Sequence, residues 1–324
     1  MKLYRIKDDV INNMEAKPFQ LEKDIQKLIE KNTETLFQLE FVHTELPVGN
    51  YRIDTLCFDS ENNSFVIIEY KKGNSYSVID QGYTYLQLLL NNKSDFLLAR
   101  SQQLNKVLKK EDIDWTQTRI IFVSPSFNSY QKDSVNFKNL PFELYEIKRF
   151  KSDVIILNKH QITSKESINS ISNKTSNDII SSVNKEVKVY DEELHISKMS
   201  ELFNERWVEL KERLLDLEDV ELSSKKYYIS LRTKNKAIAY MNFRKNNIAI
   251  EIPRGNLNTD GSKSKNFFTI EDPKRISKER SWQWKSGAQG NVYVIDFNPK
   301  ADLDYTMFLI KQKYNAIIDS YLLS

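Results

Sequence analysis

The chain has 324 residues, 40% of them hydrophobic and 29% charged, and a formal net charge of +3. This composition is typical of a folded protein, the length favours two domains, and the mild charge does not by itself indicate a nucleic-acid partner. One cysteine, Cys57, and three histidines exclude an intrachain disulfide and a Cys/His zinc spacing, so a metal ion would be held by oxygen atoms. No apolar run is long enough to span a membrane and residues 1–9 lack a signal-peptide core, so we expect a cytoplasmic protein with no membrane partner.

The first domain is predicted over residues 1–158 as an α/β fold with a mixed sheet. Apolar residues at helical spacing predict a helix over about residues 19–32, and turn signals separate the three strands that follow it. The predicted order is therefore helix, three strands, helix and strand. The elements after the first helix are strands over 41–46, 51–58 and 65–70, a helix over 77–92, a strand over 95–99, a helix near 101–111, and strands over 119–123, 142–150 and 153–157.

Residues 159–190 are predicted to be a linker, because eleven of the twenty-one residues from 164 to 184 are serine or asparagine. The second domain, residues 191–324, is expected to be α+β. It begins with a long helix from Asp191 through Leu214 and ends with a helix over 303–322. Its predicted strands cover 226–233, 237–243, 247–252 and 291–297.

Asp54 and the strand that ends at Glu69-Tyr70-Lys71 carry the residues most indicative of chemistry. In a strand, residues two apart share a face, so Glu69 and Lys71 point one way and Tyr70 the other. Two carboxylates and an ammonium that converge are suited to holding a hard divalent cation and activating a water molecule beside it. Taken singly, Asp54 could be a solubility device on an edge strand, and Glu69 and Lys71 an ordinary surface ion pair.

Gln81 and Tyr85 strengthen the functional interpretation, because residues four apart on the predicted helix over 77–92 lie on one face. The alternative is that Tyr85 belongs to the core and Gln81 to the solvated surface. Together with Asp54, Glu69 and Lys71, these residues resemble the PD-(D/E)XK nuclease superfamily, with the greatest similarity to RecB-like and archaeal mismatch-endonuclease-like members that carry a Gln-x-x-x-Tyr helix. The segments that carry the resemblance are residues 49–54, 65–71 and 80–86, within roughly the first 100 residues.

The resemblance implies a restriction-endonuclease-like αβββαβ core and a metal-dependent phosphodiesterase. By resemblance, Asp54 and Glu69 would ligate Mg²⁺ or Mn²⁺ together with the backbone carbonyl of Tyr70. Lys71 would position the attacking water or help to deprotonate it. Glu22, on the first helix, matches an extra acidic residue of many members and is a further candidate metal ligand. Arginine and isoleucine stand before Asp54 where the motif is named for proline, which leaves the aspartate in place.

The resemblance also implies that Gln81 and Tyr85 complete the catalytic set, by steadying the site or by touching the phosphate backbone. Lys72 and Gly73 follow at the end of the strand, where positive charge and close backbone approach suit a phosphodiester.

The second domain resembles an uncharacterised bacterial domain found behind such nuclease modules, in chains that are sometimes labelled predicted transport proteins. Transport has no support in the sequence, because no membrane segment is present. Residues 263–285 interleave basic residues with Trp282 and Trp284, which suits phosphate contact and base stacking. A solvated loop whose tryptophans are anchored in the core is the alternative. The basic residues are Lys265, Lys274, Arg275, Lys278 and Arg280.

The sequence therefore predicts a Mg²⁺-dependent nuclease, with DNA as the favoured substrate and endonuclease action expected. Two other hypotheses stay open. One is a non-catalytic nucleic-acid-binding or interaction module that retains the nuclease fold. The other is a scaffold whose acidic and basic residues form only surface ion pairs. A homodimer and a protein partner in defence or repair are both compatible with the sequence.

Overall fold

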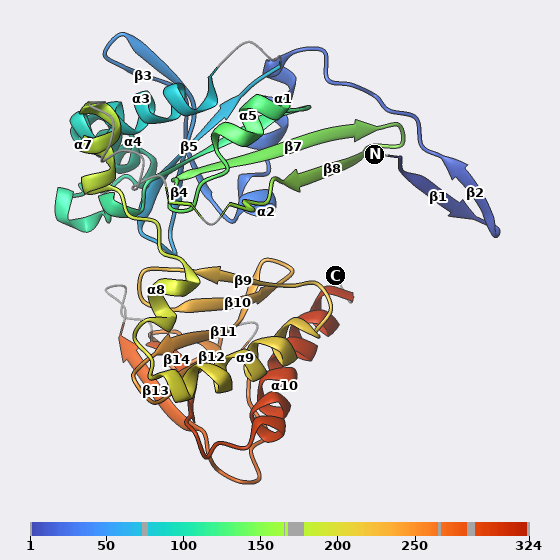
Figure 1. Cartoon of the computed structure of the whole chain (residues 1–324), viewed down its shortest axis with the longest axis vertical. Helices are drawn as coiled ribbons and strands as arrows, with labels where there is room; N and C mark the ends of the chain where they lie inside the picture. Colours follow the sequence, from blue (N-terminus) through green and yellow to red (C-terminus); the bar gives the residue numbers. More distant parts are fainter. Residues whose placement is uncertain are drawn as a thin grey trace. The chain divides into compact units, whose positions relative to one another are not determined.

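The computed structural model describes residues 2–72, 77–164, 166–167, 178–264, 267–283 and 289–322. The chain divides into two compact units, Met1–Val189 and Tyr190–Ser324 (Figure 1). Each unit has its own six-stranded sheet and its own apolar core. Among the described helices, none combines the length and the apolar composition that crossing a membrane requires.

The sheet of the first unit is mixed, with strand order β3-β4-β5-β6-β7-β8. Strands β3, β4 and β5, the three strands predicted in succession, form an antiparallel meander. Strands β5, β6 and β7 run parallel, and β8 returns antiparallel to β7. Every residue of β5 is buried, as expected of a strand with a continuous apolar run and helices on both faces of its sheet. The strands are β3 Glu40–Val48, β4 Tyr51–Asp59, β5 Ser64–Tyr70, β6 Arg119–Ser124, β7 Phe142–Phe150 and β8 Val154–Lys159.

Helices cover both faces of this sheet, and β5 sends alternate side chains to each. Val66 and Ile68 belong to the core beneath helices α1 (Glu22–Glu30) and α2 (Thr33–Phe37). Phe65 and Ile67 belong to the core beneath helices α3 and α4. Glu69 continues this second set, so it faces α3. The other helical segments described before residue 160 are α3 Val78–Asn91, α4 Lys93–Leu104, α5 Ser129–Ser134 and the short 3₁₀ turns Lys110–Asp112 and Trp115–Gln117.

The order helix, three strands, helix, strand is present, so the predicted mixed α/β fold class is confirmed. Two predicted elements of this unit are wrong. Residues 95–99 lie in helix α4 and not in a strand, and the helix predicted near 101–111 is not present, because α4 ends at Leu104 and is followed by the 3₁₀ turn Lys110–Asp112. The run Phe96-Leu97-Leu98-Ala99 resembles a buried strand by composition alone. In the helix, Phe96 is buried while Leu98 is 58% exposed, so the run is divided between the two sides of α4.

The predicted linker also differs from the structure. Helix α7 (Asp178–Glu186) packs against α3, and Val183 and Val187 are buried in the core of the first unit. The Tyr83 hydroxyl donates a hydrogen bond to Asn184 Oδ1 over 3.2 Å. Serine and asparagine dominate the composition and conceal the helical spacing of Val183 and Val187. The first unit therefore extends to residue 189 instead of 158, while the second begins at residue 190.

Replacing Val183 with alanine should destabilise the first unit by about 1 to 3 kcal/mol, because it leaves a cavity beneath α7. The matched substitution Ile179→Ala, at a position that is 37% exposed on the same helix, should change the free energy of unfolding by less than about 0.5 kcal/mol. The measurement is hydrogen exchange of the α3 and α7 amides by mass spectrometry on the full chain. Exchange should become faster in Val183→Ala and stay unchanged in the Ile179 variant. Equal and negligible effects of the two substitutions would show that residues 178–187 behave as a linker after all.

The second unit has an antiparallel sheet with strand order β13-β14-β12-β11-β10-β9, and its helices α9 and α10 contribute Trp207, Leu210, Leu309 and Ile310 to the core against it. This is the predicted α+β arrangement. The elements are α8 Glu192–Ile196, α9 Glu201–Leu215, β9 Val220–Ser224, β10 Ile229–Thr233, β11 Lys236–Phe243, β12 Ile248–Leu257, β13 Lys278–Gln283, β14 Gln289–Phe297 and α10 Leu303–Leu322.

Two features of this unit differ from the prediction. The single long helix from Asp191 is two helices, and the chain between them is tied down where the Ser200 N–H donates to the Lys245 carbonyl over 2.8 Å. Strands β9 and β13 were not predicted. Strand β13 lies at the edge of the sheet with all six residues exposed, so it needs no apolar alternation.

Candidate active site

Asp54 lies where strands β4 and β5 separate. Their paired register runs from Asp59 opposite Ser64 to Thr55 opposite Ile68. One residue beyond this ladder, Asp54 Oδ2 accepts a hydrogen bond from the Tyr70 N–H over 3.1 Å. The carboxylate therefore takes the place of a strand carbonyl as acceptor, which holds the side chain of Asp54 beside the end of β5.

Glu69 gathers three of the predicted residues around one carboxylate oxygen. Its Oε1 accepts hydrogen bonds from Lys71 Nζ at 2.8 Å, from Gln81 Nε2 at 2.7 Å and from the Tyr85 hydroxyl at 3.4 Å. Gln81 Nε2 also donates to the Tyr85 hydroxyl over 3.2 Å. Lys71 reaches Glu69 Oε1 because residues two apart on a strand share a face. Gln81 and Tyr85 reach the same oxygen because they lie one turn apart on helix α3. The other oxygen, Glu69 Oε2, is buried without a hydrogen-bond partner.

Glu22 begins helix α1 and reaches the end of β5, where its carboxylate accepts a hydrogen bond from the Lys72 N–H. The ammonium of Lys72 donates to the Gln20 carbonyl. The negative charge of Glu22 also acts to raise the pKa of Asp54. Gly73 lies outside the described residues.

A second polar network lies on the opposite face of the sheet, and sequence reasoning missed it. The Tyr70 hydroxyl is 3.1 Å from Thr55 Oγ1, and Thr55 Oγ1 donates to Glu30 Oε1 over 2.7 Å. Gln26 Nε2 donates to Glu30 Oε1 and to the backbone carbonyl of Asp54, both over 2.9 Å. The network therefore ties helix α1 to the backbone that carries Asp54. Its signal in the sequence is a polar pair four residues apart on α1, beside the buried Ile25 and Ile29.

Both carboxylates are harder to ionise than usual. Burial raises the pKa of Glu69 to about 7, and the charge of Asp54 acts in the same direction against the opposing effects of Lys71 and Gln81. Burial likewise raises the pKa of Asp54, with a smaller contribution from Glu22, although the Tyr70 N–H and Lys71 oppose it. Two acids in one partly dehydrated place resist simultaneous ionisation. A cation bound between them would remove this cost.

The residues present fit a divalent cation, although the set is small. In the described parts of the chain, no three or more acidic, histidine or cysteine residues are grouped as metal ligands. Mg²⁺ commonly uses only one or two protein carboxylates and completes its shell with water and substrate oxygens. The unpartnered Oε2 of Glu69 and the charge cost of the Asp54–Glu69 pair are what such an ion would satisfy. The ligand roles themselves remain predictions.

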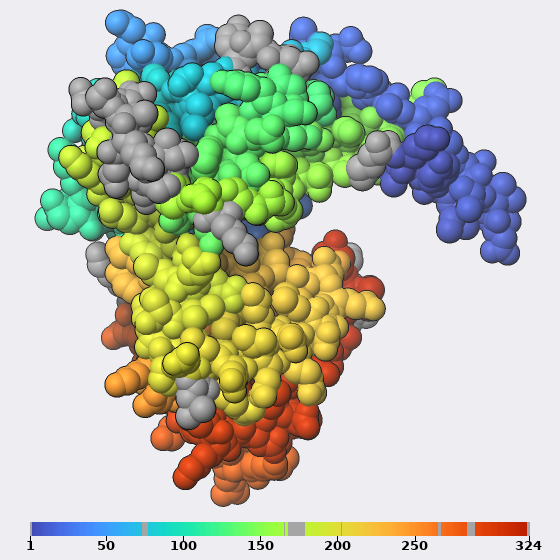
Figure 2. Space-filling view, in the orientation of Figure 1, coloured from blue at the N-terminus to red at the C-terminus, as the bar shows by residue number. Residues whose placement is uncertain are grey.

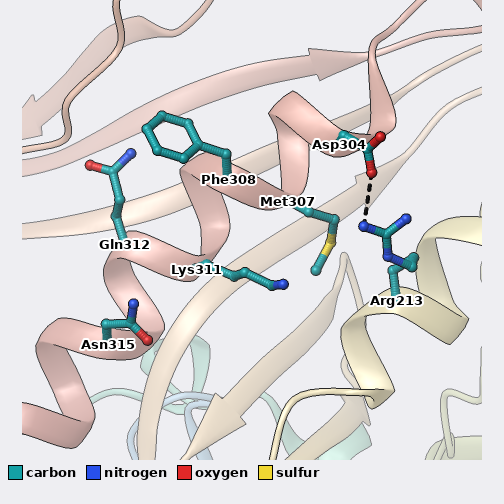
Figure 3. Close-up of a pocket in the computed structure, with 7 residues that line it drawn as sticks. All are labelled: Arg213, Asp304, Met307, Phe308, Lys311, Gln312 and Asn315. Atoms are coloured by element: carbon teal, nitrogen blue, oxygen red, sulfur yellow. Dashed lines mark hydrogen bonds and ion pairs between the residues drawn. The ribbon is translucent and has the colours of Figure 1, made fainter.

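The second unit contains a separate hollow of about 370 Å³ along helices α9 and α10. Met307 and Phe308 form its apolar part, and Arg213 and Asp304 form an ion pair at its margin over 2.8 Å (Figure 3). Lys311 extends into it from α10. None of the predicted site residues lines this hollow, so it is not the candidate active site.

Only part of the predicted basic and aromatic segment can be located. Lys265 and Trp284 lie outside the described residues. Lys274 pairs with Asp302 over 2.8 Å, and Arg280 pairs with Glu251, so acids of the second unit already engage two of these cations. A nucleic-acid contact by this segment remains a hypothesis.

The fold and the site together define a mixed α/β protein with two acidic residues, Asp54 and Glu69, at the end of strand β5. No family model matches the chain. The sequence is 37% identical over 317 residues to an uncharacterized protein of Haemophilus influenzae, a match that covers 96% of this chain and 99% of that protein. The chain therefore belongs to the same family as this Haemophilus protein.

Three solved structures show partial similarity. The EndoMS-dsDNA2 complex is 20% identical with a TM-score of 0.23, over 40% of this chain and 47% of that chain. A repair endonuclease from Pyrococcus abyssi is 18% identical with a TM-score of 0.23, over 40% and 49%. SfsA of Pyrococcus furiosus in complex with Ca²⁺ is 16% identical with a TM-score of 0.22, over 42% and 60%. At these TM-scores, neither the site residues nor the activity of those proteins can be assigned to this chain.

Proposed function

We propose that the first unit is a divalent-metal-dependent nuclease that hydrolyses phosphodiester bonds in DNA. The observation that carries the proposal is that the charge of Asp54 acts on the buried Glu69, whose Oε1 lies 2.8 Å from Lys71 Nζ and whose Oε2 is buried without a hydrogen-bond partner. The choice of DNA rests on the resemblance of the motif to the PD-(D/E)XK superfamily, as does endonuclease action.

Each side chain has a distinct part in the proposed reaction. Gln81 and Tyr85 hold Glu69 by its Oε1 atom, which leaves Oε2 for Mg²⁺ or Mn²⁺ alongside Asp54 and the Tyr70 carbonyl. Such an ion, when bound, would neutralise charge on the scissile phosphate and lower the pKa of a coordinated water. Lys71, whose ammonium lies 2.8 Å from Glu69 Oε1, would orient that water or donate a hydrogen bond to a phosphate oxygen.

The fold around these residues supports their positioning. Lys71 is 13% exposed and Glu69 5% exposed by side chain, so both are largely withdrawn from solvent. Hydrogen bonds to charged groups are strong in such surroundings. The Gln26 and Glu30 network on the opposite face restrains the backbone at Asp54. A loosely held surface ion pair would have neither feature.

The direct test is incubation of the purified full-length protein with labelled circular, linear, single-stranded and branched DNA, and with RNA, in Mg²⁺ or Mn²⁺. We expect cleavage of at least one DNA that is lost in EDTA and in Glu69→Ala. If every substrate stays intact, or if Glu69→Ala cuts as well as the wild type, the proposed nuclease activity is wrong. Salt-dependent DNA binding without cleavage, retained when both carboxylates are removed, would instead indicate a non-catalytic binding module.

A further inference from the structure

The N-terminal residues form an isolated hairpin, which we call the arm: strands β1 (Tyr4–Lys7) and β2 (Val10–Asn13) with their connecting turn. The turn residues Asp8 and Asp9 both have left-handed backbone angles, with φ of 51° and 59°, as a two-residue hairpin turn requires. The two strands form a sheet by themselves, and all eight strand residues are exposed. Figure 2 shows the arm, in dark blue, standing out from the first unit.

The arm has one apolar and one basic face. Tyr4 pairs with Asn13, and Ile6 pairs with Ile11, so three large apolar side chains share one face. Tyr4, Ile6 and Ile11 are 50%, 71% and 66% exposed. An isolated two-stranded hairpin is marginally stable in water and needs further strands or a packing partner. The apolar face is therefore a surface that no other described residue of the chain covers. The other face carries Arg5, Lys7, Val10 and Asn12.

Opposite charges lie at the two ends of the arm. Asp8 and Asp9 form the tip. At the base, Lys17 and Arg149 lie together, because the Lys17 N–H donates to the Arg149 carbonyl over 2.8 Å and Arg149 Nε donates to the Lys17 carbonyl over 3.1 Å. The ion pairs between described residues include none of these four side chains, although the Arg149 guanidinium lies 4.6 Å from the centroid of the Phe19 ring. Glu15 and Lys151 form an ion pair with each other beside them. The arm thus has an acidic tip, and the residues next to its base, Lys17 and Arg149 with the Glu15–Lys151 pair, carry a net positive charge. The apolar face lies between these two ends.

We propose that the arm is a self-association surface whose occupant is a second copy of this chain, with two arms packed apolar face to apolar face and antiparallel about a two-fold axis. This arrangement covers Tyr4, Ile6 and Ile11 of both copies at once. It also brings each acidic tip to the basic base of the other copy, since a two-fold contact repeats every pairing. A nucleic-acid backbone would complement Arg5 and Lys7 but would leave the apolar face uncovered and be repelled by the acidic tip.

The arm contributes eight strand residues per copy, compared with roughly 20 to 30 residues per side in a standard interface. We therefore expect a dimer that forms at micromolar concentrations and weakens as salt screens the tip-to-base contacts. This association does not depend on nuclease activity.

Sedimentation equilibrium of the full-length protein over roughly 1 to 200 μM should show a monomer–dimer equilibrium. The double substitution Ile6→Thr with Ile11→Thr should raise the dissociation constant at least about tenfold, because it removes the apolar contact while threonine still favours a strand. The matched double substitution Arg5→Thr with Lys7→Thr, on the opposite face of the same strands, should change it less than about threefold. A wild type that stays monomeric throughout, or a dimer indifferent to Ile6 and Ile11, overturns the proposal.

A chemical test locates the contact. The natural cysteine, Cys57, is buried, so a cysteine introduced by Ile6→Cys would be the exposed thiol available for an intermolecular disulfide. We expect mild oxidation to cross-link Ile6→Cys and to leave Arg5→Cys uncross-linked. The double substitution Asp8→Asn with Asp9→Asn should also weaken the dimer, because it removes the negative charge of the tip. Asparagine adopts left-handed backbone angles readily, so the turn should be kept. Equal cross-linking from both faces, or a monomer in which the isoleucine substitutions reduce only DNA affinity, would rule out the second copy as the occupant.

Discussion

Asp54→Asn is expected to reduce the rate of DNA cleavage on the order of 10³-fold, equivalent to about 4 kcal/mol of transition-state stabilisation. The substitution removes one of the two carboxylate charges proposed to hold the metal ion. It keeps an oxygen in position to accept the Tyr70 N–H, so the end of β5 should stay in place. The measurement is the single-turnover cleavage rate at saturating Mg²⁺ or Mn²⁺, together with Mn²⁺ binding followed by electron paramagnetic resonance.

Asp59→Asn is the matched control, because Asp59 lies on the same strand and is buried, whereas Asp54 is half-buried. Its carboxylate pairs with Arg119 over 2.8 Å, away from Glu69. We expect this variant to lose stability but to retain cleavage within about threefold when assayed well below its unfolding temperature. Equal losses of cleavage in the two variants would indicate a general effect on the fold, and full activity of Asp54→Asn would place the metal elsewhere.

Glu69→Gln is expected to stabilise the first unit at pH 8 in the absence of divalent ions, by on the order of 2 to 3 kcal/mol. Folding raises the pKa of Glu69 from an ordinary value of 4.5 to about 7, because burial and Asp54 disfavour its charged form. Between those pH values the folded state binds more protons than the unfolded state. The unfolding free energy of the wild type should therefore fall as the pH rises from 4.5 to 7 and level off above 7. Lys71 still faces Asp54 in the variant.

The check is the unfolding free energy of both proteins in urea from about pH 4 to pH 8 with EDTA, followed by hydrogen exchange of first-unit amides. The two curves should meet near pH 4.5 and separate above it, and Mg²⁺ should raise the stability of the wild type alone. If Glu69 and Lys71 formed only a surface ion pair, the curves would differ by less than about 1 kcal/mol at every pH.

Glu143→Gln provides a control of opposite sign. Burial acts to raise the pKa of Glu143, but the charges of Lys159 and Arg119 outweigh this effect and hold that pKa at about 2. A carboxylate with a lowered pKa contributes stability above its unfolded pKa, and this contribution disappears as the pH falls through the folded value. Glu143→Gln should therefore destabilise the protein at pH 8. Stabilisation by both substitutions would mean that the effect is not specific to the crowded pair of Asp54 and Glu69.

Several elements could be predicted because their signals are local. The apolar runs of β4 and β5, with turn signals between them, placed Asp54 and Glu69 on neighbouring strands, and helix α10 was predicted with its observed bounds. The pairs Glu69–Lys71 and Gln81–Tyr85 follow from the two-residue repeat of a strand and the one-turn repeat of a helix. Those repeats hold wherever the element forms, so they did not require the rest of the fold.

Other elements could not be predicted because their stability comes from distant contacts. Residues 95–99 have the composition of a strand, but they belong to helix α4, from which Phe96 packs into the apolar core of the first unit. Residues 178–186 have the composition of a linker, and contact with α3 makes them part of the first unit. Gln26 and Glu30 resemble surface polar residues until α1 is placed against β4.

By itself, the sequence determined the class of fold, the two units and the identity of the residues proposed for chemistry, since these depend on residue type and on spacing within single elements. The tertiary structure alone decided that Asp54 replaces a strand partner at Tyr70, that three donors share one oxygen of Glu69, and that the other oxygen is buried without a partner. It also decided the raised pKa values of Asp54 and Glu69. Burial and the field of neighbouring charges depend on which segments the fold brings together, and no local spacing contains that information.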